Sequence, residues 1–66
     1  MILKPGESYE VSTATITVTN LSNTKNGSFS VTGASYILEP DETKRIDLME
    51  EPDRVINSGS TNLNVD

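Results

Sequence analysis

The pattern that most constrains this chain is an alternation of apolar and polar residues with period two, repeated in short runs. The clearest run is TATITVTN, in which Ala14, Ile16 and Val18 share one face and threonines occupy the other. Such alternation predicts a half-buried β-strand, and no segment shows a helical period over more than one turn. Roughly six to seven short strands follow, which predict an all-β domain: a small antiparallel β-sandwich or barrel, jelly-roll-like in type.

Turn residues separate these runs. Residues 4–7 (KPGE) predict a type II turn, because proline presets φ at the second position and glycine accepts a positive φ at the third. Residues 39–42 (EPDE) keep the proline but place aspartate third, which favours a type I turn. The dipeptide Asn26-Gly27 fits either a hairpin turn or a longer polar loop.

The first proline turn lies in a sequence segment that recurs later in the chain. ILKPGESYEV at residues 2–11 aligns without gaps with ILEPDETKRI at residues 37–46. Further along, the V-x-N sequence ending at Asn20 matches the one ending at Asn57. Two explanations are open: an internal duplication, or the reuse of proline turns that is common among β meanders.

The length of the chain permits one domain, residues 1–66, because neither half is long enough to bury a core of its own. If the repeat is a duplication, it covers residues 2–34 and 37–66 and predicts two pseudo-symmetric halves.

The inward positions of the runs form the predicted core. They are Tyr9, Val11, Ile16, Val18, Phe29, Val31, Tyr36, Leu38, Ile46, Leu48, Val55, Leu63 and Val65. A chain this small has a marginal core and has no cysteine for disulfides, so we expect association with protein partners. Self-association, a trimer included, and docking on a larger assembly both satisfy this expectation. Ile2, Leu3 and Ile37 lie outside the main alternation and are the predicted partner contacts.

The net charge of −5 is concentrated in the second half of the chain. The acidic residues of segment 39–53 are Glu39, Asp41, Glu42, Asp47, Glu50, Glu51 and Asp53. An acidic chain repels phosphates, so nucleic acids and anionic membranes are not expected partners. Neither a membrane-spanning apolar run nor a signal peptide is visible, and we expect a virion location if the chain is phage-encoded and a cytoplasmic one otherwise.

Histidine is absent as well as cysteine, which removes the usual nucleophile–base pairs and the commonest ligands of transition metals. The acidic segment has three interpretations: a solvated sheet edge, a catalytic carboxylate pair, or an all-oxygen calcium site. We favour the first and expect no catalytic residue, no metal site and no cofactor. The alternative function is a small ligand-, carbohydrate- or calcium-binding β domain.

The C-terminal half resembles the second sequence motif of the cupins over about 30 residues. The matching residues are Leu38, Pro40, Asp41, Pro52, Asn57, Gly59 and Leu63. Asp53 stands where the family has a metal-binding histidine, so the resemblance implies jelly-roll-like strands and not cupin chemistry.

A short, acidic all-β chain rich in Ser, Thr and Asn is also similar in type to the decoration (cement) proteins of tailed-phage virions. That resemblance implies a non-catalytic structural protein, an oligomeric accessory that binds a capsid or another large assembly.

Overall fold

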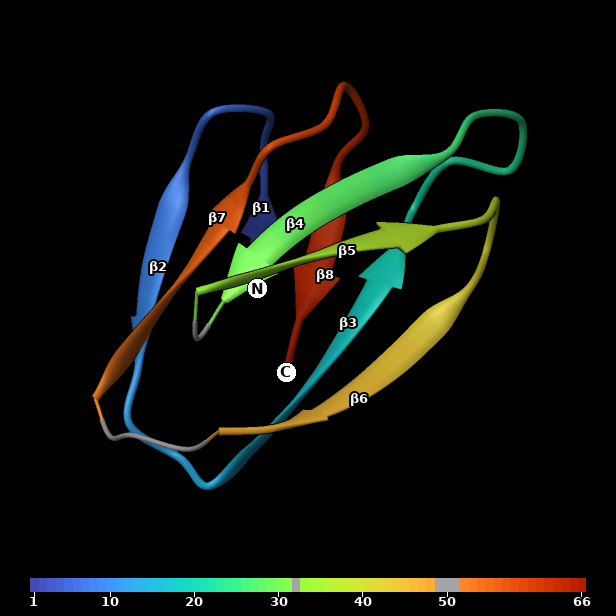
Figure 1. The fold of residues 1–66 in the computed structure, drawn as a ribbon. Coiled ribbons are helices and arrows are strands. Elements are labelled where there is room, and N and C mark those ends of the chain that lie inside the picture. Colours follow the sequence, from blue (N-terminus) through green and yellow to red (C-terminus); the bar gives the residue numbers. More distant parts are fainter. Residues whose placement is uncertain (32, 49–51) are drawn as a thin grey trace.

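The computed structural model describes residues 1–31, 33–48 and 52–66 and is an all-β sandwich (Figure 1). Its strands are β1 (Ile2–Leu3), β2 (Ser8–Val11), β3 (Thr15–Asn20), β4 (Gly27–Val31), β5 (Ala34–Leu38), β6 (Thr43–Asp47), β7 (Asp53–Asn57) and β8 (Leu63–Val65). The described residues thus form eight strands, more than the six or seven expected. The additional one is β1, whose two residues are too few to show an alternation and which pairs only with β8.

The strands form two antiparallel sheets with the orders β1-β8-β3-β6 and β2-β7-β4-β5. Only β4 and β5 are neighbours both in sequence and in a sheet; every other hydrogen-bonded pair joins strands that are distant in the chain. Two packed four-stranded sheets connected in this way form a jelly-roll-like sandwich rather than a closed barrel.

The two halves of the chain occupy equivalent places in the fold. The equivalence appears when four is added to every strand number, with β1 counted as the strand after β8. The order β1-β8-β3-β6 then becomes β5-β4-β7-β2. That is the second sheet read backwards. Each half therefore supplies two strands to each sheet, as the repeat predicts for pseudo-symmetric halves. Descent from a duplicated half stays a prediction.

The two proline turns have matching hydrogen bonds. In the first turn, the Glu7 amide donates to the Lys4 carbonyl at 3.0 Å, and the Glu7 Oε1 accepts from the Lys4 amide at 2.8 Å. In the second turn, the Glu42 amide donates to the Glu39 carbonyl at 3.0 Å, and the Glu42 Oε1 accepts from the Glu39 amide at 2.8 Å. The glutamate shared by the two repeats thus closes each turn through both its backbone and its side chain.

The third residue of both turns has a positive φ, 83° at Gly6 and 63° at Asp41. A type I turn requires a negative φ there, so the expected type I turn at residues 39–42 is wrong. The backbone is held in this conformation from outside: the Asp41 amide donates to the Ser22 carbonyl at 2.9 Å, as the Gly6 amide donates to the Asn57 carbonyl at 2.9 Å.

Two buried asparagines, one at the end of β3 and one at the end of β7, join the halves. The Asn57 side-chain amide donates to the carbonyls of Leu3 at 2.9 Å and Thr61 at 2.7 Å, and its Oδ1 accepts from the Gly59 amide at 3.1 Å. Since Leu3 directly precedes the first proline turn, a residue of the second half holds the turn of the first half in place.

Asn20, in the first half of the chain, makes the equivalent contacts, including one with the second half. Its side-chain amide donates to the carbonyls of Lys25 at 2.8 Å and Leu38 at 3.4 Å, and its Oδ1 accepts from the Ser22 amide at 3.1 Å. Leu38 precedes the second proline turn as Leu3 precedes the first. Every buried side-chain polar atom that the structure describes has a hydrogen-bond partner, so this polar pair adds no unsatisfied group to the core.

The apolar core lies between the two sheets. It consists of Leu3, Val11, Ile16, Val18, Phe29, Val31, Leu38, Ile46, Val55, Leu63 and Val65, with Tyr36 and Leu48 partly buried against it. Two assignments made from the alternation are wrong. Tyr9 has 39% of its surface exposed, because it lies on edge strand β2 with a neighbouring strand on one side only. Leu3 is 1% exposed and belongs to the core.

Candidate interaction surface

The structure separates the three predicted contact residues. Ile2 and Ile37 are 53% and 65% exposed, whereas Leu3 is buried because its pairing with Leu63 turns it toward the core. The expected surface role of Leu3 is therefore wrong. Ile2 lies on β1 and Ile37 on β5, which are edge strands of different sheets, so these two residues do not form one patch.

The four edge strands differ in how well they are protected against pairing with another chain. Short length and charged residues are the usual protections of a sheet edge. β1 has two residues, β2 carries Glu10, and β6 carries Lys44, Arg45 and Asp47. β5 (ASYIL) has five residues and no charge. Among the described edges, β5 alone combines the length of a full strand with an uncharged sequence.

Aromatic packing supports β5 from the side of the core. Tyr36 stacks on Phe29 of the neighbouring strand, with ring centroids 5.1 Å apart and the planes inclined by 20°, a geometry that stabilises the pair beyond simple burial. Phe29 is fully buried, so Tyr36 fixes the middle of β5 to the core. A preformed edge loses little conformational entropy when a further strand binds.

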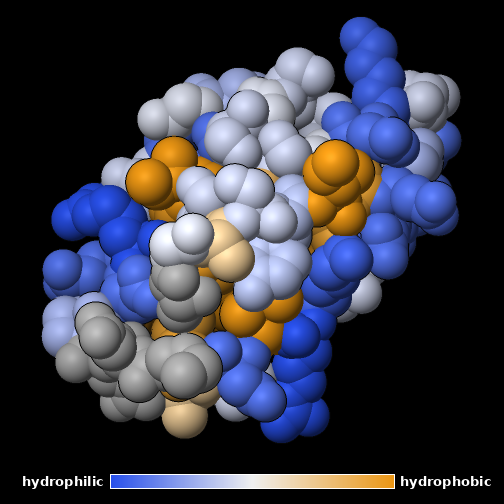
Figure 2. Space-filling model, in the orientation of Figure 1, coloured by the Kyte–Doolittle hydropathy of each residue, from blue (hydrophilic) through white to orange (hydrophobic). Residues whose placement is uncertain are grey.

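The outer face of the same sheet carries small polar residues around two exposed isoleucines. Ile37 lies opposite Ser28, and Ile56, 41% exposed, lies opposite Ser30. Figure 2 shows hydrophobic areas on this side of the molecule, divided by pale and polar atoms. Ile56 is not among the predicted contacts, although its alternation with the buried Val55 predicts that it faces solvent.

The acidic segment is distributed over several elements. Glu39, Asp41 and Glu42 lie at the second proline turn, Asp47 is on β6 and Asp53 on β7, while Glu50 and Glu51 lie outside the described residues. In residues 1–31, 33–48 and 52–66, no three acidic side chains gather closely enough to hold a metal ion. The Glu42 carboxylate is instead engaged in its turn.

Nor does the described part of the chain contain a helix of the length and apolarity needed to cross a membrane. Comparison with protein-family models, with curated proteins and with solved structures found no match to this chain.

Proposed function

We propose that this protein is a non-catalytic interaction module that associates with other chains through the β5 edge. The observation that carries the proposal is the contrast between the uncharged, full-length edge of β5 and the short or charged edges of β1, β2 and β6. Unpaired backbone groups along such an edge bind a further strand by β-augmentation. The absence of cysteine and histidine from the sequence supports a role without catalysis.

The partner that fits this edge is a second copy of the chain. An antiparallel pairing of β5 with itself, centred on Tyr36, places Ile37 of each copy opposite Ser35 of the other. The acidic Glu39 then lies opposite Gly33, so no like charges meet across the new strand pair. The result is one continuous sheet of eight strands with a twofold axis at its centre, the commonest symmetry of protein dimers.

The wider role that we propose is that of an accessory protein in a larger assembly, of the kind that decorates phage capsids. The similarity of type to decoration proteins and the small core of an acidic, all-β chain support this role. Capsid or tail genes beside the coding gene would favour it, whereas genes of sugar metabolism would argue for ligand binding instead.

Sedimentation velocity from micromolar to millimolar concentration tests the edge pairing. We expect a reversible dimer of the wild type, and a dissociation constant at least about tenfold higher for Ile37→Lys, because a lysine on the edge opposes pairing. Both copies carry a net charge of −5, so added salt should strengthen the dimer by screening their repulsion.

Ile2→Lys is the matched control. Ile2 occupies the position equivalent to Ile37 in the repeat, and it is similarly exposed, but it lies on the short β1 edge. This variant makes the same charge change and should leave the dimer intact. A wild type that remains monomeric at millimolar concentration, or an equal loss of dimer in both variants, would refute the β5 proposal.

A further inference from the structure

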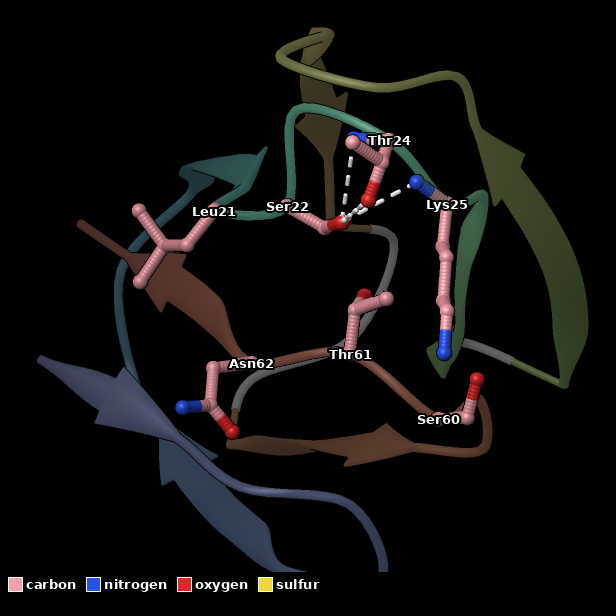
Figure 3. A pocket seen from close by; sticks show the side chains of 7 residues that line it. All are labelled: Leu21, Ser22, Thr24, Lys25, Ser60, Thr61 and Asn62. Atoms are coloured by element: carbon pink, nitrogen blue, oxygen red, sulfur yellow. Dashed lines mark hydrogen bonds between the residues drawn. The ribbon is translucent and has the colours of Figure 1, made fainter.

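A hollow of about 380 Å³ opens between two loops, one from each half of the chain (Figure 3). The loop between β3 and β4 supplies Leu21, Ser22, Thr24 and Lys25, and the loop between β7 and β8 supplies residues 60–62. The two loops occupy equivalent places in the pseudo-symmetric fold. The hollow is widely open to solvent, so a ligand bound there would stay partly exposed.

Hydrogen bonds hold both loops in place. The Leu21 amide donates to the Asn62 carbonyl at 3.0 Å, which joins one loop to the other. At the floor of the hollow, the buried Thr61 hydroxyl donates to Asn20 Oδ1 at 2.8 Å, and the Asn20 side-chain amide donates to the Lys25 carbonyl at 2.8 Å. The hollow is thus preformed, and a ligand would not have to order it.

The charge of the lining is opposite to that of the protein. Lys25 is the one charged residue among those that line the hollow, in a chain with a net charge of −5. Figure 3 shows its side chain extending across the hollow toward Ser60. Within the described part of the chain, the Lys25 ammonium group has no carboxylate partner, since the ion pair found there joins Met1 and Asp66. The lining therefore favours an anion over a cation as a ligand.

The remaining lining groups are hydroxyls and an amide, with Leu21 as an exposed apolar wall. Ser22 Oγ accepts hydrogen bonds from the backbone amides of Thr24 at 3.3 Å and Lys25 at 3.0 Å, and it lies 3.5 Å from the Thr24 hydroxyl, so its hydrogen bonds are made within its own loop. The side chains of Ser60 and Asn62 make no hydrogen bond to another described residue.

We propose that this hollow, the loop pocket, binds a small ligand that carries one carboxylate and several hydroxyl groups, of the hexuronate class. Lys25 would bind the carboxylate, while Ser60 and Asn62 would bind the hydroxyls. No aromatic side chain lines the pocket for a sugar ring to stack on, so a neutral sugar would depend on exposed neutral hydrogen bonds. The charge-assisted bond to Lys25 is roughly twice as strong as a neutral one and selects the acid.

Titration of the ¹⁵N-labelled full chain with sodium glucuronate, followed by amide chemical shifts at low ionic strength, tests this assignment. We expect saturable shifts confined to residues 21–25 and 60–62, with weaker effects from sodium acetate, which lacks the hydroxyls, and from glucose, which lacks the charge. Lys25→Met should weaken glucuronate binding about tenfold, the loss of one charge-assisted contact. Lys44→Met makes the same change on β6, outside the pocket, and should leave binding unchanged.

Unperturbed amides elsewhere in each spectrum show that a variant has kept its fold. An absence of saturable shifts, or equal glucuronate binding by Lys25→Met and the wild type, would overturn the proposal. Equal binding of acetate and glucuronate would reduce the pocket to a simple anion site and overturn the sugar-acid assignment. These outcomes are independent of the dimer measured for β5, because neither lysine lies on that strand.

Discussion

Replacing Asn57 by aspartate provides the most direct test of how the halves are joined. The substitution keeps the shape of the side chain but exchanges its amide donor for an oxygen. Two carbonyl groups, those of Leu3 and Thr61, then lose their 2.9 Å and 2.7 Å hydrogen bonds and face a carboxylate. Each unsatisfied buried group costs about 1–3 kcal/mol, so for two groups we expect Asn57→Asp to lower the free energy of unfolding by about 2–6 kcal/mol at pH 7. A domain of this length has a total free energy of unfolding of about 3–10 kcal/mol, so the substitution removes much of its stability.

The loss should depend on pH in a defined direction. Burial among carbonyl oxygens raises the pKa of the introduced carboxyl above its value in the unfolded chain, about 3.9. The folded variant then binds the proton more tightly than the unfolded variant. Its stability relative to the wild type therefore falls as the pH rises from about 4 through the raised pKa, and the deficit is smallest near pH 3.

Urea unfolding followed by far-ultraviolet circular dichroism at pH 7 and pH 3 measures both effects, and Asn62→Asp is the control. Asn62 is exposed, so the same chemical change there should alter stability by less than about 0.5 kcal/mol. A variant that is unfolded at pH 7 counts as support only if structure returns at pH 3. A deficit below about 1 kcal/mol at pH 7, or one that is no smaller at low pH, would refute the role assigned to Asn57.

Two further substitutions test the turns and the loop floor. Asp41→Gly should raise the free energy of unfolding by about 0.5 kcal/mol, because glycine adopts the positive φ of 63° without strain. Gly6→Ala should lower the free energy of unfolding by about 1 kcal/mol or more, because alanine is strained at a positive φ. Thermal melts of the two variants should therefore show midpoints that move in opposite directions. Gly27→Ala should lower the free energy of unfolding by about 1–3 kcal/mol, because the added Cβ would lie 2.7 Å from the Thr61 Oγ1 and 3.2 Å from the Asn20 side chain. If the urea midpoint of Gly27→Ala equals that of the wild type, the prediction is wrong, and the residues around Gly27 move aside at little cost in free energy.

The sequence predicts the strands well because alternation is a local property. The inward residues of β3, β4 and β7 follow from the period alone, and Val18, Phe29 and Val55 are fully buried as predicted. Alternation does not say how many neighbours a strand has. Tyr9 therefore remains exposed on an edge, although its register beside Val55 turns it toward the core.

The sequence does not predict how the strands pair, because pairing depends on contacts between residues that are distant in the chain. The dipeptide Asn26-Gly27 fits a hairpin, yet it connects β3 and β4, which belong to different sheets. Gly27 is needed there because a side chain would collide with Thr61 of the other half. Local turn chemistry could not decide between hairpin and loop, since the deciding contact comes from the opposite end of the sequence.

For the candidate interaction edge, too, the sequence predicts only part of what the structure shows. The exposure of Ile37 was predicted from the sequence, whereas the status of β5 as an edge, and the burial of Leu3, depend on the sheet order. The loop pocket gave no sequence signal, because its two segments lie 35 or more residues apart and meet only in the folded chain.

By itself, then, the sequence predicted the fold class and the inward faces of most strands, and it left two explanations open for the repeated segment. The tertiary structure decided which strands are edges, the positive φ of Asp41 and the burial of Asn20 and Asn57. The physical reason is the range of the interactions. Period and turn propensity act within a few residues, but one of the two carbonyl groups that accept from the buried Asn57 amide belongs to Leu3, 54 residues away.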